Sequence, residues 1–534
     1  MSASSSSKLR LSAEMPPFIE KPVLGVTNRT KIVCTLGPAS SSPEVLAKMI
    51  TAGMDVCRLN FSHGSHEGHR KMFNLVRHIS AQHEHQVSIL ADIQGPKIRC
   101  GKMEKPFQPA IGSTIKVTAE EVIGTPERFT ITYSTIVKDL VKGDLIFVND
   151  GVVRLRVQSK TDTDLICVVE ATGTISDNKG CNIPSGQLSL SVVTEKDAED
   201  LVLIAELAPE YLATSFVGTA DDIHEVRSHL HKHGNFTTKI IAKIERPVAL
   251  ENIDAIIAAS DGIMVARGDL GVEIPPEEVP AAQKSMVKKC NKEGRPVIVA
   301  TQMLESMINT ARPTRAEASD VFNAVLDGAD AVMLSAESSV GNYPIESVSV
   351  MDDIVGLAEK YLAKRDPNDY DSASQGLVET MGHATKTLAE EFGDLNWDGV
   401  ILSLTYTGVS TRMISKYRPG MNIYAVTPNL QTARELNLVW GVRSIYAPEL
   451  EGENLEHLAL RAISIVAEMG VVKIGDHVVV TSASLYGDCE LGCMSGIYNV
   501  EQALKMWDLA KKGALKPHPR VRNALQQGKP PGSK

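Results

Sequence analysis

The feature that most constrains the fold of this chain is an alternation, in its first two-thirds, of short β-branched apolar runs and helical stretches. The runs that qualify as strands begin at Lys31, Met54, Val87, Glu210, Lys239, Gly262, Pro296 and Ala329. Continuous apolar strands that alternate with amphipathic helices indicate a parallel sheet covered by helices. These eight units predict an α/β fold of the closed (β/α)8 TIM barrel type, with a doubly wound open sheet as the structural alternative.

One interval in this alternation is too long to be a loop. More than 100 residues separate Asp92 from Tyr211, far beyond a usual connection. The interval contains short alternating runs, bounded by Gly, Asp and Asn, at 113–121, 128–133, 144–150, 151–160 and 164–173. This pattern predicts a small, β-barrel-like domain, residues 103–191, inserted between the third and fourth strands.

The remaining segments divide the chain further. We assign 29–102 and 192–365 to the barrel, and 377–534 to a C-terminal α/β domain with a basic tail. Residues 1–28 contain a serine run without an apolar core and are expected to be a disordered tail, with a transit peptide as the alternative. The sequence contains no run of about 18 apolar residues, so a membrane-spanning helix is not expected.

Charge and cysteine content narrow the class of protein. The net charge of −10, from 55 Lys and Arg against 65 Asp and Glu, argues against a protein that coats nucleic acid or an anionic membrane. Of the eight cysteines only Cys489 and Cys493 lie close together, without a second pair or a nearby histidine, so a zinc site there is disfavoured. The others are expected to be buried thiols in a reducing compartment.

Polar residues gather where the predicted strands end, which is where barrels place their functional groups. Arg58, Asn60 and Ser62 follow one another at every second position, so their side chains project to the same side. The other strand ends supply Asp92, Ser215, Lys243, Glu245, Arg267, Asp269, Thr301, Ser335 and Glu337. So many charges at one mouth would be costly without a ligand, which indicates an active site.

The residue types at this mouth indicate a chemistry. Glu245 and Asp269 are hard oxygen ligands suited to Mg²⁺ or Mn²⁺, and no cluster suited to zinc or iron accompanies them. Arg58 and Lys243, with Arg99 as a further candidate, offer positive charge to an anionic substrate. A short helix expected after Ala266 would add free amides for a carboxylate or phosphate. A divalent metal, Arg and Lys around an anion is the layout for phosphoryl transfer.

Several motifs carry a family resemblance. They read TKIVCTLGPAS (30–40), RLNFSHGSHEGH (58–69), DIQGPKIR (92–99), KIIAKIE (239–245), DGIMVARGDLGVEIP (261–275), the stretch 300–338 and GNYP (341–344). In this order they strongly resemble the pyruvate kinase family, including an inserted domain at the expected place. The resemblance implies a glycolytic enzyme that transfers a phosphoryl group from phosphoenolpyruvate to ADP and yields pyruvate and ATP.

The resemblance also implies roles for matching residues. Glu245 and Asp269 would hold Mg²⁺ (or Mn²⁺), Lys243 would neutralise the phosphoryl group and Arg58 would brace its oxygens. Thr301 would help to deliver a proton to the enolate. The substrate would be bound by Arg267, Gly268 and Asp269 through their amides, with Thr301 and Ser335 alongside. The nucleotide side would consist of Pro38, Asn60, His63, Arg99 and Lys196, with the inserted domain closing as a lid that excludes water.

The family's potassium site matches less well. K⁺ would be held by Asn60, Ser62, Asp92 and the carbonyl of Ile93, and all four are present. However, Lys97 stands where K⁺-dependent members typically have Glu, so an ammonium group could supply the charge that K⁺ otherwise brings. We therefore predict that K⁺ is not required, unless Lys97 points to solvent.

A second site is expected in the C-terminal domain. The residues Thr405, Tyr406, Thr407, Gly408 and Ser410 join a strand to a helix, where hydroxyls and amides can cradle a phosphate, although an ordinary capped turn is the alternative. In family members activated by fructose 1,6-bisphosphate this loop binds the effector. The stretch from Ser482 to Met494 has no Lys or Arg and carries Asp488 and Glu490, so we predict a preference for a sugar monophosphate. The family further suggests a cytoplasmic homotetramer.

Two other functions compete with this interpretation. A barrel lyase or aldolase that acts on a 2-oxo acid through Mg²⁺ would share the metal carboxylates but would need neither Lys243 nor a lid. A catalytically inactive homologue could serve as a regulatory subunit, although every expected catalytic residue is present. Formation of pyruvate and ATP from phosphoenolpyruvate and ADP would distinguish these possibilities.

Overall fold

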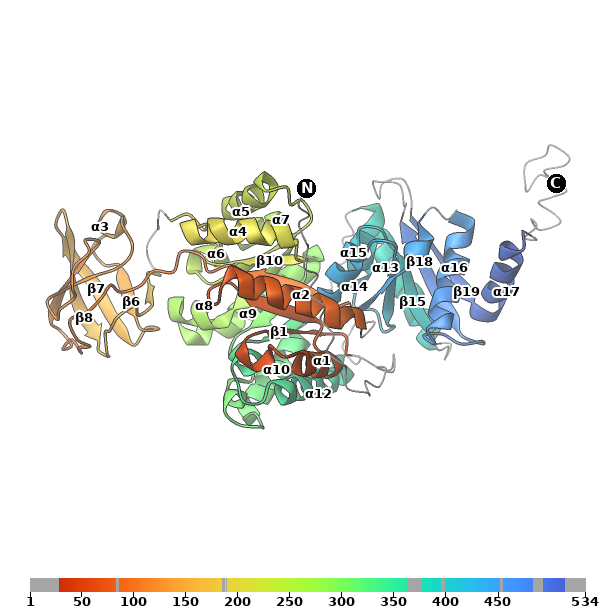
Figure 1. Ribbon diagram of the computed structural model, residues 1–534, viewed down its shortest axis with the longest axis horizontal. Coiled ribbons are helices and arrows are strands. Elements are labelled where there is room, and N and C mark those ends of the chain that lie inside the picture. Colours follow the sequence, from red (N-terminus) through yellow and green to blue (C-terminus); the bar gives the residue numbers. More distant parts are fainter. Residues whose placement is uncertain are drawn as a thin grey trace, which may run out of the picture.

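The computed structural model describes residues 28–82, 86–184, 188, 190–362, 376–394, 399–451, 455–483 and 493–513. Three bodies follow one another along its longest axis: the inserted β domain at one end, the barrel in the middle and the C-terminal domain at the other end (Figure 1). Among the helices in these ranges, none is both long and apolar enough to cross a membrane.

The central body is a closed barrel of parallel strands. Its strands are β1 (Lys31–Thr35), β2 (Val56–Asn60), β3 (Ser88–Asp92), β10 (Tyr211–Thr214), β11 (Lys239–Ile244), β12 (Gly262–Ala266), β13 (Val297–Ala300) and β14 (Ala331–Leu334). They pair in the order β1-β14-β13-β12-β11-β10-β3-β2, with β2 returning to β1. Each of the eight predicted strands is confirmed, and the closure excludes the open-sheet alternative.

Helices surround this barrel and bury the outward-facing side chains. They are α1 (Pro43–Thr51), α2 (His66–Gln82), α4 (Glu195–Leu207), α5 (Ala220–Lys232), α6 (Pro247–Glu251), α7 (Ile253–Ala259), α8 (Arg267–Glu273), α9 (Val279–Glu293), α10 (Arg315–Asp327), α11 (Ala336–Ser339) and α12 (Pro344–Leu362). Cys57 and Leu59 pack in the outer core between strands and helices, whereas Val56 packs in the inner core of the barrel. The predicted alternation of side chains along β2 is therefore confirmed.

The inserted domain is a small β structure with its own core. Its elements are β4 (Thr114–Thr118), β5 (Arg128–Thr130), α3 (Ile136–Asp139), β6 (Leu145–Val148), β7 (Val153–Lys160), β8 (Asp164–Ala171) and β9 (Cys181–Asn182). The strands form a sheet in the order β5-β4-β8-β7-β6-β9. Arg99 bridges to Gly180 beside β9, and Cys100 bridges to Ile131 beside β5, so the two edges curl towards each other. This explains the barrel-like character of the domain.

The N-terminal boundary of the inserted domain lies slightly earlier in the chain than the sequence predicts. Ile98 and Cys100 lie in the core of the inserted domain, although the predicted boundary is at residue 103. Six cysteines whose side chains the structure describes are free and buried, as expected; they are Cys34, Cys57, Cys100, Cys167, Cys181 and Cys290. Cys489, and with it the disfavoured zinc pair, lies outside the described residues.

The C-terminal domain is a second α/β unit. Its elements are α13 (Leu377–Asp394), β15 (Gly399–Leu404), α14 (Val409–Lys416), β16 (Ile423–Thr427), α15 (Leu430–Glu435), η5 (Leu436–Leu438), β17 (Val442–Tyr446), α16 (Leu455–Glu468), β18 (His477–Ala483), β19 (Cys493–Asn499) and α17 (Val500–Lys511). The sheet order is β17-β16-β15-β18-β19, and only β19 runs antiparallel to its neighbour. The α/β fold predicted for this domain is confirmed, and it includes an antiparallel strand, β19, at one edge of the sheet.

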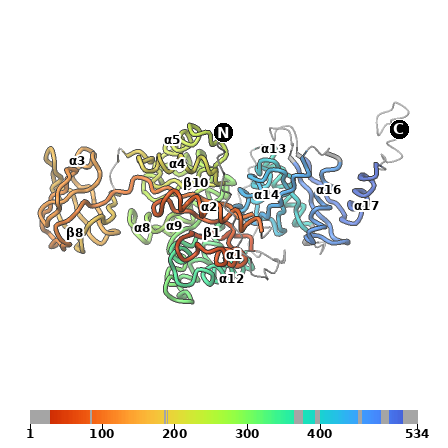
Figure 2. The backbone as a smooth tube through the Cα atoms, viewed as in Figure 1, coloured from red at the N-terminus to blue at the C-terminus, as the bar shows by residue number. Residues whose placement is uncertain are grey.

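The C-terminal domain packs against the end of the barrel where the strands begin (Figure 2). Leu438 belongs to the inner core of the barrel itself. At the start of β10 the Tyr211 hydroxyl donates to the carbonyl of Glu435 at 2.6 Å, and at the start of β1 Lys31 Nζ donates to the carbonyl of Val442 at 2.8 Å. The opposite end of the barrel, where the strands finish, therefore remains available for a site beneath the inserted domain.

Candidate active site

The charged residues predicted at the strand ends come together in one network. Arg58, at the end of β2, donates from Nε to Asp92 Oδ2 at 2.7 Å and from Nη1 to Thr35 Oγ1 at 2.9 Å. The Thr35 hydroxyl in turn donates to the carbonyl of Leu334 at 2.9 Å. These bonds fix the guanidinium group against the mouth of the barrel, with its plane held by two neighbouring strands.

Lys243 occupies the middle of the network. Its Nζ lies 2.6 Å from Ser215 Oγ, 2.9 Å from Glu245 Oε1 and 3.4 Å from Asp92 Oδ1. Burial alone would lower the pKa of Lys243, but the carboxylates of Asp92 and Glu245 outweigh it and hold the pKa above its ordinary value. Lys243 is therefore a permanently charged ammonium at the centre of the mouth.

Asp92 is the fixed anion of this network. Burial would raise its pKa, yet the charges of Arg58 and Lys243 hold the pKa below its usual range. Its side chain is 1% exposed. Asp92 therefore pairs with both cations and holds them together at the mouth.

Glu245 and Asp269 provide the oxygen ligands expected of a divalent metal site. The Glu245 carboxylate is 1% exposed, and its Oε2 accepts a hydrogen bond from the amide of Phe216 at 2.8 Å. Burial raises the pKa of Glu245 despite the charge of Lys243, and the nearby Asp269 carboxylate raises it further. Two neighbouring carboxylates that repel each other in this way suit a site for a hard divalent cation.

The start of α8 forms the next part of the site. The amide of Gly268 donates to Thr301 Oγ1 at 2.7 Å, which brings the ends of β12 and β13 together. A Cβ at residue 268 would lie 3.2 Å from that hydroxyl, so glycine permits the close approach. Thr301 itself has a φ of 69°, a strained backbone conformation of the kind that occurs at functional sites.

The Arg267 side chain is turned away from this mouth. Its guanidinium pairs with Asp320 at 2.7 Å and donates to the carbonyl of Thr301 at 2.7 Å. Only the backbone amide of Arg267 is thus left for substrate, in line with the role that the resemblance implies. Ser335 lies at the end of β14, where its own amide is bound by Glu337 at 2.8 Å.

Glu337 is a structural carboxylate. It is 2% exposed and also accepts a hydrogen bond from the amide of Leu304 at 3.1 Å. Its position at the end of a strand predicts a side chain at the mouth of the barrel. In the structure its carboxylate instead joins the loops that follow β13 and β14.

The expected nucleotide side lies between β2 and α4. Lys196 Nζ donates to the carbonyl of Phe61 at 2.7 Å and to Asp200 Oδ2 at 2.6 Å. The other Asp200 oxygen lies 2.7 Å from His66 Nε2. Asn60 Oδ1 accepts the amide of Ser62 at 3.1 Å. Lys196 is therefore held next to the loop that follows β2, directly after Asn60.

The described contacts do not bring every predicted residue to the mouth. Arg99 lies in the inserted domain, where its Nη1 donates to the carbonyl of Asn178 at 3.1 Å. Lys97 is exposed, which is the alternative to its predicted role at the potassium site, and its Cε lies 4.0 Å from where a Cβ on Gly180 would be. His63 is exposed, and Pro38 begins the short helix η1 (Pro38–Ser40).

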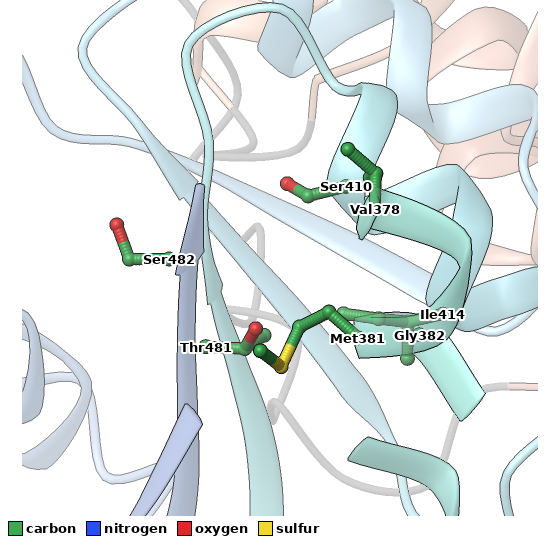
Figure 3. Close-up of a pocket in the computed structure, with 7 residues that line it drawn as sticks. All are labelled: Val378, Met381, Gly382, Ser410, Ile414, Thr481 and Ser482. Atoms are coloured by element: carbon green, nitrogen blue, oxygen red, sulfur yellow. The ribbon is translucent and has the colours of Figure 1, made fainter. Parts of the chain in front are cut away.

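The predicted effector loop surrounds the start of α14. The amide of Gly408 donates to Thr405 Oγ1 at 2.9 Å, and the Tyr406 carbonyl accepts the hydroxyl of Thr432 at 2.8 Å. The buried hydroxyl of Ser410 has no hydrogen-bond partner among the described residues. It lies at a narrow junction between α13, α14 and β18 (Figure 3), where the free volume open to a water molecule is about 0 Å³. Residues 484–492, with Asp488 and Glu490, lie outside the described residues.

Two positioning residues were missed by sequence reasoning: Thr35 orients Arg58, and Asp200 orients Lys196. Ser215, which was predicted at the mouth, joins Lys243 to the carbonyl of Ile93, which accepts its hydroxyl at 2.8 Å. Thr35 lies two residues after Val33, which packs in the inner core, so the alternation along β1 would have revealed it. Asp200 lies one helical turn after Lys196, which is a detectable spacing.

Comparison with known proteins agrees with this geometry. The family model "Pyruvate kinase, barrel domain" matches residues 27–348, and "Pyruvate kinase, alpha/beta domain" matches residues 379–489. A pyruvate kinase of Bacillus licheniformis is 41% identical over 497 residues, which cover 91% of this chain and 82% of that protein. One of Geobacillus stearothermophilus is 41% identical over 491 residues, with coverages of 91% and 81%. The crystal structure of a pyruvate kinase from Cryptosporidium parvum matches with a TM-score of 0.81 at 35% identity, and covers 89% of this chain and 96% of that one.

Proposed function

This chain belongs to the pyruvate kinase family, and from this premise we propose which of its residues carry out the reaction. The enzyme is a glycolytic phosphotransferase that converts phosphoenolpyruvate and ADP into pyruvate and ATP. The observation that supports the assignment best is the network around Lys243, whose Nζ lies within 3.4 Å of Ser215, Glu245 and Asp92.

We infer that Lys243 and Arg58 bind the phosphoryl group during its transfer. Charge spreads over the equatorial oxygens of the phosphoryl group in the transition state, and fixed cations stabilise that state most. Arg58 is held by Asp92 and Thr35 and needs no rearrangement when the substrate arrives. Lys243, charged and buried, would neutralise the group between the donor and acceptor oxygens.

The substrate carboxylate is assigned to the first turn of α8. The amides of Arg267, Gly268 and Asp269 have no partner within α8, because they lie at its start, and the positive end of the helix favours an anion. The amide of Gly268 now donates to Thr301 Oγ1 and would exchange this partner for the carboxylate. Thr301 and Ser335 would complete this side of the site. The Thr301 hydroxyl, which now accepts the amide of Gly268, would help to move a proton to the enolate carbon, with a water molecule in between.

A divalent cation, Mg²⁺ or Mn²⁺, fits Glu245 and Asp269. When bound, it would supply charge stabilisation for the phosphate oxygens. Burial and mutual repulsion raise the pKa of Glu245, and a cation between the two carboxylates would relieve that cost. Glu245 is also fixed by the amide of Phe216, so one of its oxygens is already oriented.

ADP would bind beside the β2 loop and beneath the inserted domain. Pro38, Asn60, His63, Arg99 and Lys196 are assigned to this nucleotide side. Lys196 contacts the carbonyl of Phe61 on the barrel, close to His63, whereas Arg99 belongs to the inserted domain. Closure of that domain as a lid would carry Arg99 to the nucleotide and exclude water, which would otherwise hydrolyse the phosphoryl donor.

A coupled assay tests the reaction. With Mg²⁺, phosphoenolpyruvate and ADP, formation of both pyruvate and ATP is expected. An aldolase or lyase would consume a 2-oxo acid without forming ATP, and an inactive homologue would form neither product. Loss of activity on chelation of the metal, with recovery on adding Mg²⁺ or Mn²⁺, tests the metal assignment.

We further propose that the enzyme works without K⁺. Asp92, the charged member of the K⁺-type set with Asn60 and Ser62, is already paired with Arg58 and Lys243. The carbonyl of Ile93 accepts the hydroxyl of Ser215. Because the negative charge of Asp92 is already compensated by these two cations, a further cation such as K⁺ would be attracted only weakly.

Lys97 would contribute by turning its exposed ammonium towards this set when the lid closes. Substantial activity is expected with Mg²⁺ and a bulky organic cation in place of K⁺, and Lys97→Glu should create dependence on K⁺. An absolute K⁺ requirement in the unmodified enzyme would contradict the proposal.

A sugar monophosphate is proposed as effector at residues 405–410. The unpartnered hydroxyl of Ser410 and the hydroxyl of Thr407 would bind one phosphate at the start of α14. Titration of glucose 6-phosphate and fructose 1,6-bisphosphate at sub-saturating phosphoenolpyruvate tests the preference. Stronger activation by the bisphosphate would refute it.

The assembly is proposed to be a homotetramer that works in the cytoplasm. The antiparallel strand β19 is an edge of its sheet, and Met494 and Ile497 on it are 62% and 48% exposed. Exposed apolar side chains on an edge strand are typical of surfaces that pair with another chain. Light scattering that gives a monomer mass would contradict the assembly.

A further inference from the structure

The short helix α8 connects the expected metal site to the inserted domain. Its first turn contains Asp269, and its last residue is Glu273. Glu273 is 8% exposed, and its Oε1 accepts a hydrogen bond from Asn182 Nδ2 at 2.9 Å. Asn182 belongs to β9 and pairs with Phe147 of β6, so it is part of the sheet of the lid.

A second contact lies beside the first. The turn between β6 and β7 approaches the same helix, because a Cβ on Gly151 would lie 3.7 Å from Val272 Cγ1. Figure 1 shows α8 on the side of the barrel that faces the inserted domain. The lid therefore touches the barrel at the end of the helix whose start carries a metal ligand.

The carboxylate of Glu273 is incompletely bonded for a buried group. Among the described residues its buried Oε2 has no hydrogen-bond partner, which normally costs free energy. Burial raises the pKa of Glu273 to about 7, against the hydrogen bond from Asn182. Asp269 and Glu245 raise this pKa further, so Glu273 and the proposed metal ligands interact electrostatically. A buried carboxylate with one unbonded oxygen adds little to the stability of the fold, which favours a positioning role for Glu273.

We infer that Glu273, through its hydrogen bond to Asn182, is a positioning residue by which the lid orients α8 and with it the metal ligand Asp269. A helix as short as α8 has little stability of its own and depends on its tertiary contacts. Leu270 fixes one face of α8 in the barrel core, and the lid contact fixes its last turn. This inference rests on the assignment of Asp269 to the metal in the proposed function.

Asn182→Ala tests the contact. Loss of one hydrogen bond to a buried carboxylate should speed hydrogen exchange of the α8 amides about fivefold. It should also weaken Mn²⁺ binding about fivefold, and electron paramagnetic resonance measures this affinity. Turnover at saturating phosphoenolpyruvate should fall by the same order. Gln108→Ala is the matched control, because it removes a lid amide that bonds to Thr174 within the lid at 3.0 Å, and it should change none of these quantities.

Variants of Glu273 separate contact from charge. Glu273→Gln keeps an acceptor oxygen for Asn182 and should retain slow exchange in α8, whereas Glu273→Ala should match Asn182→Ala. The Asn182→Ala, Glu273→Ala double variant should be no worse than either single one, because both remove the same contact. Fully additive effects, or an Asn182→Ala enzyme with unchanged α8 exchange and Mn²⁺ affinity, would overturn the inference.

Asp269→Asn tests the underlying assignment separately. It should abolish Mn²⁺ binding at the site while leaving the Asn182–Glu273 contact in place. Unchanged Mn²⁺ binding in this variant would refute the metal assignment, and the inference with it. Wild-type protein that fails to form ATP, but whose α8 exchange and Mn²⁺ affinity still respond to Asn182→Ala, would refute the proposed reaction and leave the inference standing.

Discussion

Lys243 keeps its positive charge in a place where burial alone would favour the neutral amine. Its neighbours Asp92 and Glu245 reverse the effect of burial on its pKa, and Ser215 fixes its position at 2.6 Å. Because this positive charge is already in place, the site need not reorganise when the phosphoryl group is transferred. The proposed role of Lys243 thus depends on the neighbouring carboxylates of Asp92 and Glu245.

Lys243→Met is expected to lower turnover at least about 10²–10³-fold, while the apparent affinity for phosphoenolpyruvate changes little, because the cation acts mainly in the transition state. Steady-state kinetics of pyruvate formation measure both quantities. Lys239→Met is the matched control, since Lys239 begins the same strand at the far end of the barrel. A loss of less than about tenfold, or ~1.4 kcal/mol of barrier, would show that the role is misassigned.

At the scale of elements, the nucleotide side depends on how α4 begins. Thr194 Oγ1 accepts the amide of Asp197 at 3.1 Å, and Asp197 Oδ2 accepts the amide of Thr194 at 3.1 Å, which forms a capping box. Lys196 lies in the first turn of this helix. Asp197 also accepts the amide of Gly95 at 3.2 Å, in the segment that leads into the lid. The cap therefore holds Lys196, which we propose to bind the nucleotide, and the base of the inserted domain together.

Thr194→Ala should raise the apparent KM for ADP about fivefold with little change in kcat, because loss of a helix cap costs about 1 kcal/mol and loosens the turn that carries Lys196. Initial rates at varied ADP measure the effect. Thr314→Ala removes the same type of capping box from α10, where Thr314 Oγ1 accepts the amide of Glu317 at 3.2 Å. An equal rise in KM for that control would mean that general destabilisation, and not Lys196, is responsible.

At the scale of the whole molecule, the barrel and the C-terminal domain share a buried boundary. Glu435 lies there, 6% exposed, at the end of α15. Burial raises its pKa to about 7, although the charges of Lys239 and Arg412 oppose the shift. The folded state therefore binds a proton more tightly than the unfolded state does. Stability should fall as pH rises from about 4.5 to 7 and should not depend on this group above that range.

Glu435→Gln removes this titration. The variant should differ little from the wild type at pH 5 but should be more stable at pH 8, by up to roughly 2–3 kcal/mol. Urea unfolding of both proteins at the two pH values measures the difference. Other groups with raised pKa values, such as Glu273, are present in both proteins and cancel. An equal difference in stability at pH 5 and pH 8 would contradict the assignment.

The sequence alone determined the elements of the barrel and the direction of their side chains. Strand and helix periods depend on neighbouring residues, so the eight strands, the insertion and the convergence of Arg58, Lys243 and Glu245 could all be predicted. The resemblance of the strand-end motifs to a known family then indicated the reaction. These features need no knowledge of how distant segments pack.

Only the tertiary structure decided how the three bodies meet. Asn182 and Glu273 are 91 positions apart, and Leu438 enters the core of a barrel whose last strand ends at Leu334. The sequence likewise left open that the Arg267 side chain pairs with Asp320 and that Lys97 is exposed. Such contacts follow from the packing of whole elements, in which each side chain takes the partner that the assembled fold brings within reach, and no local pattern encodes that choice.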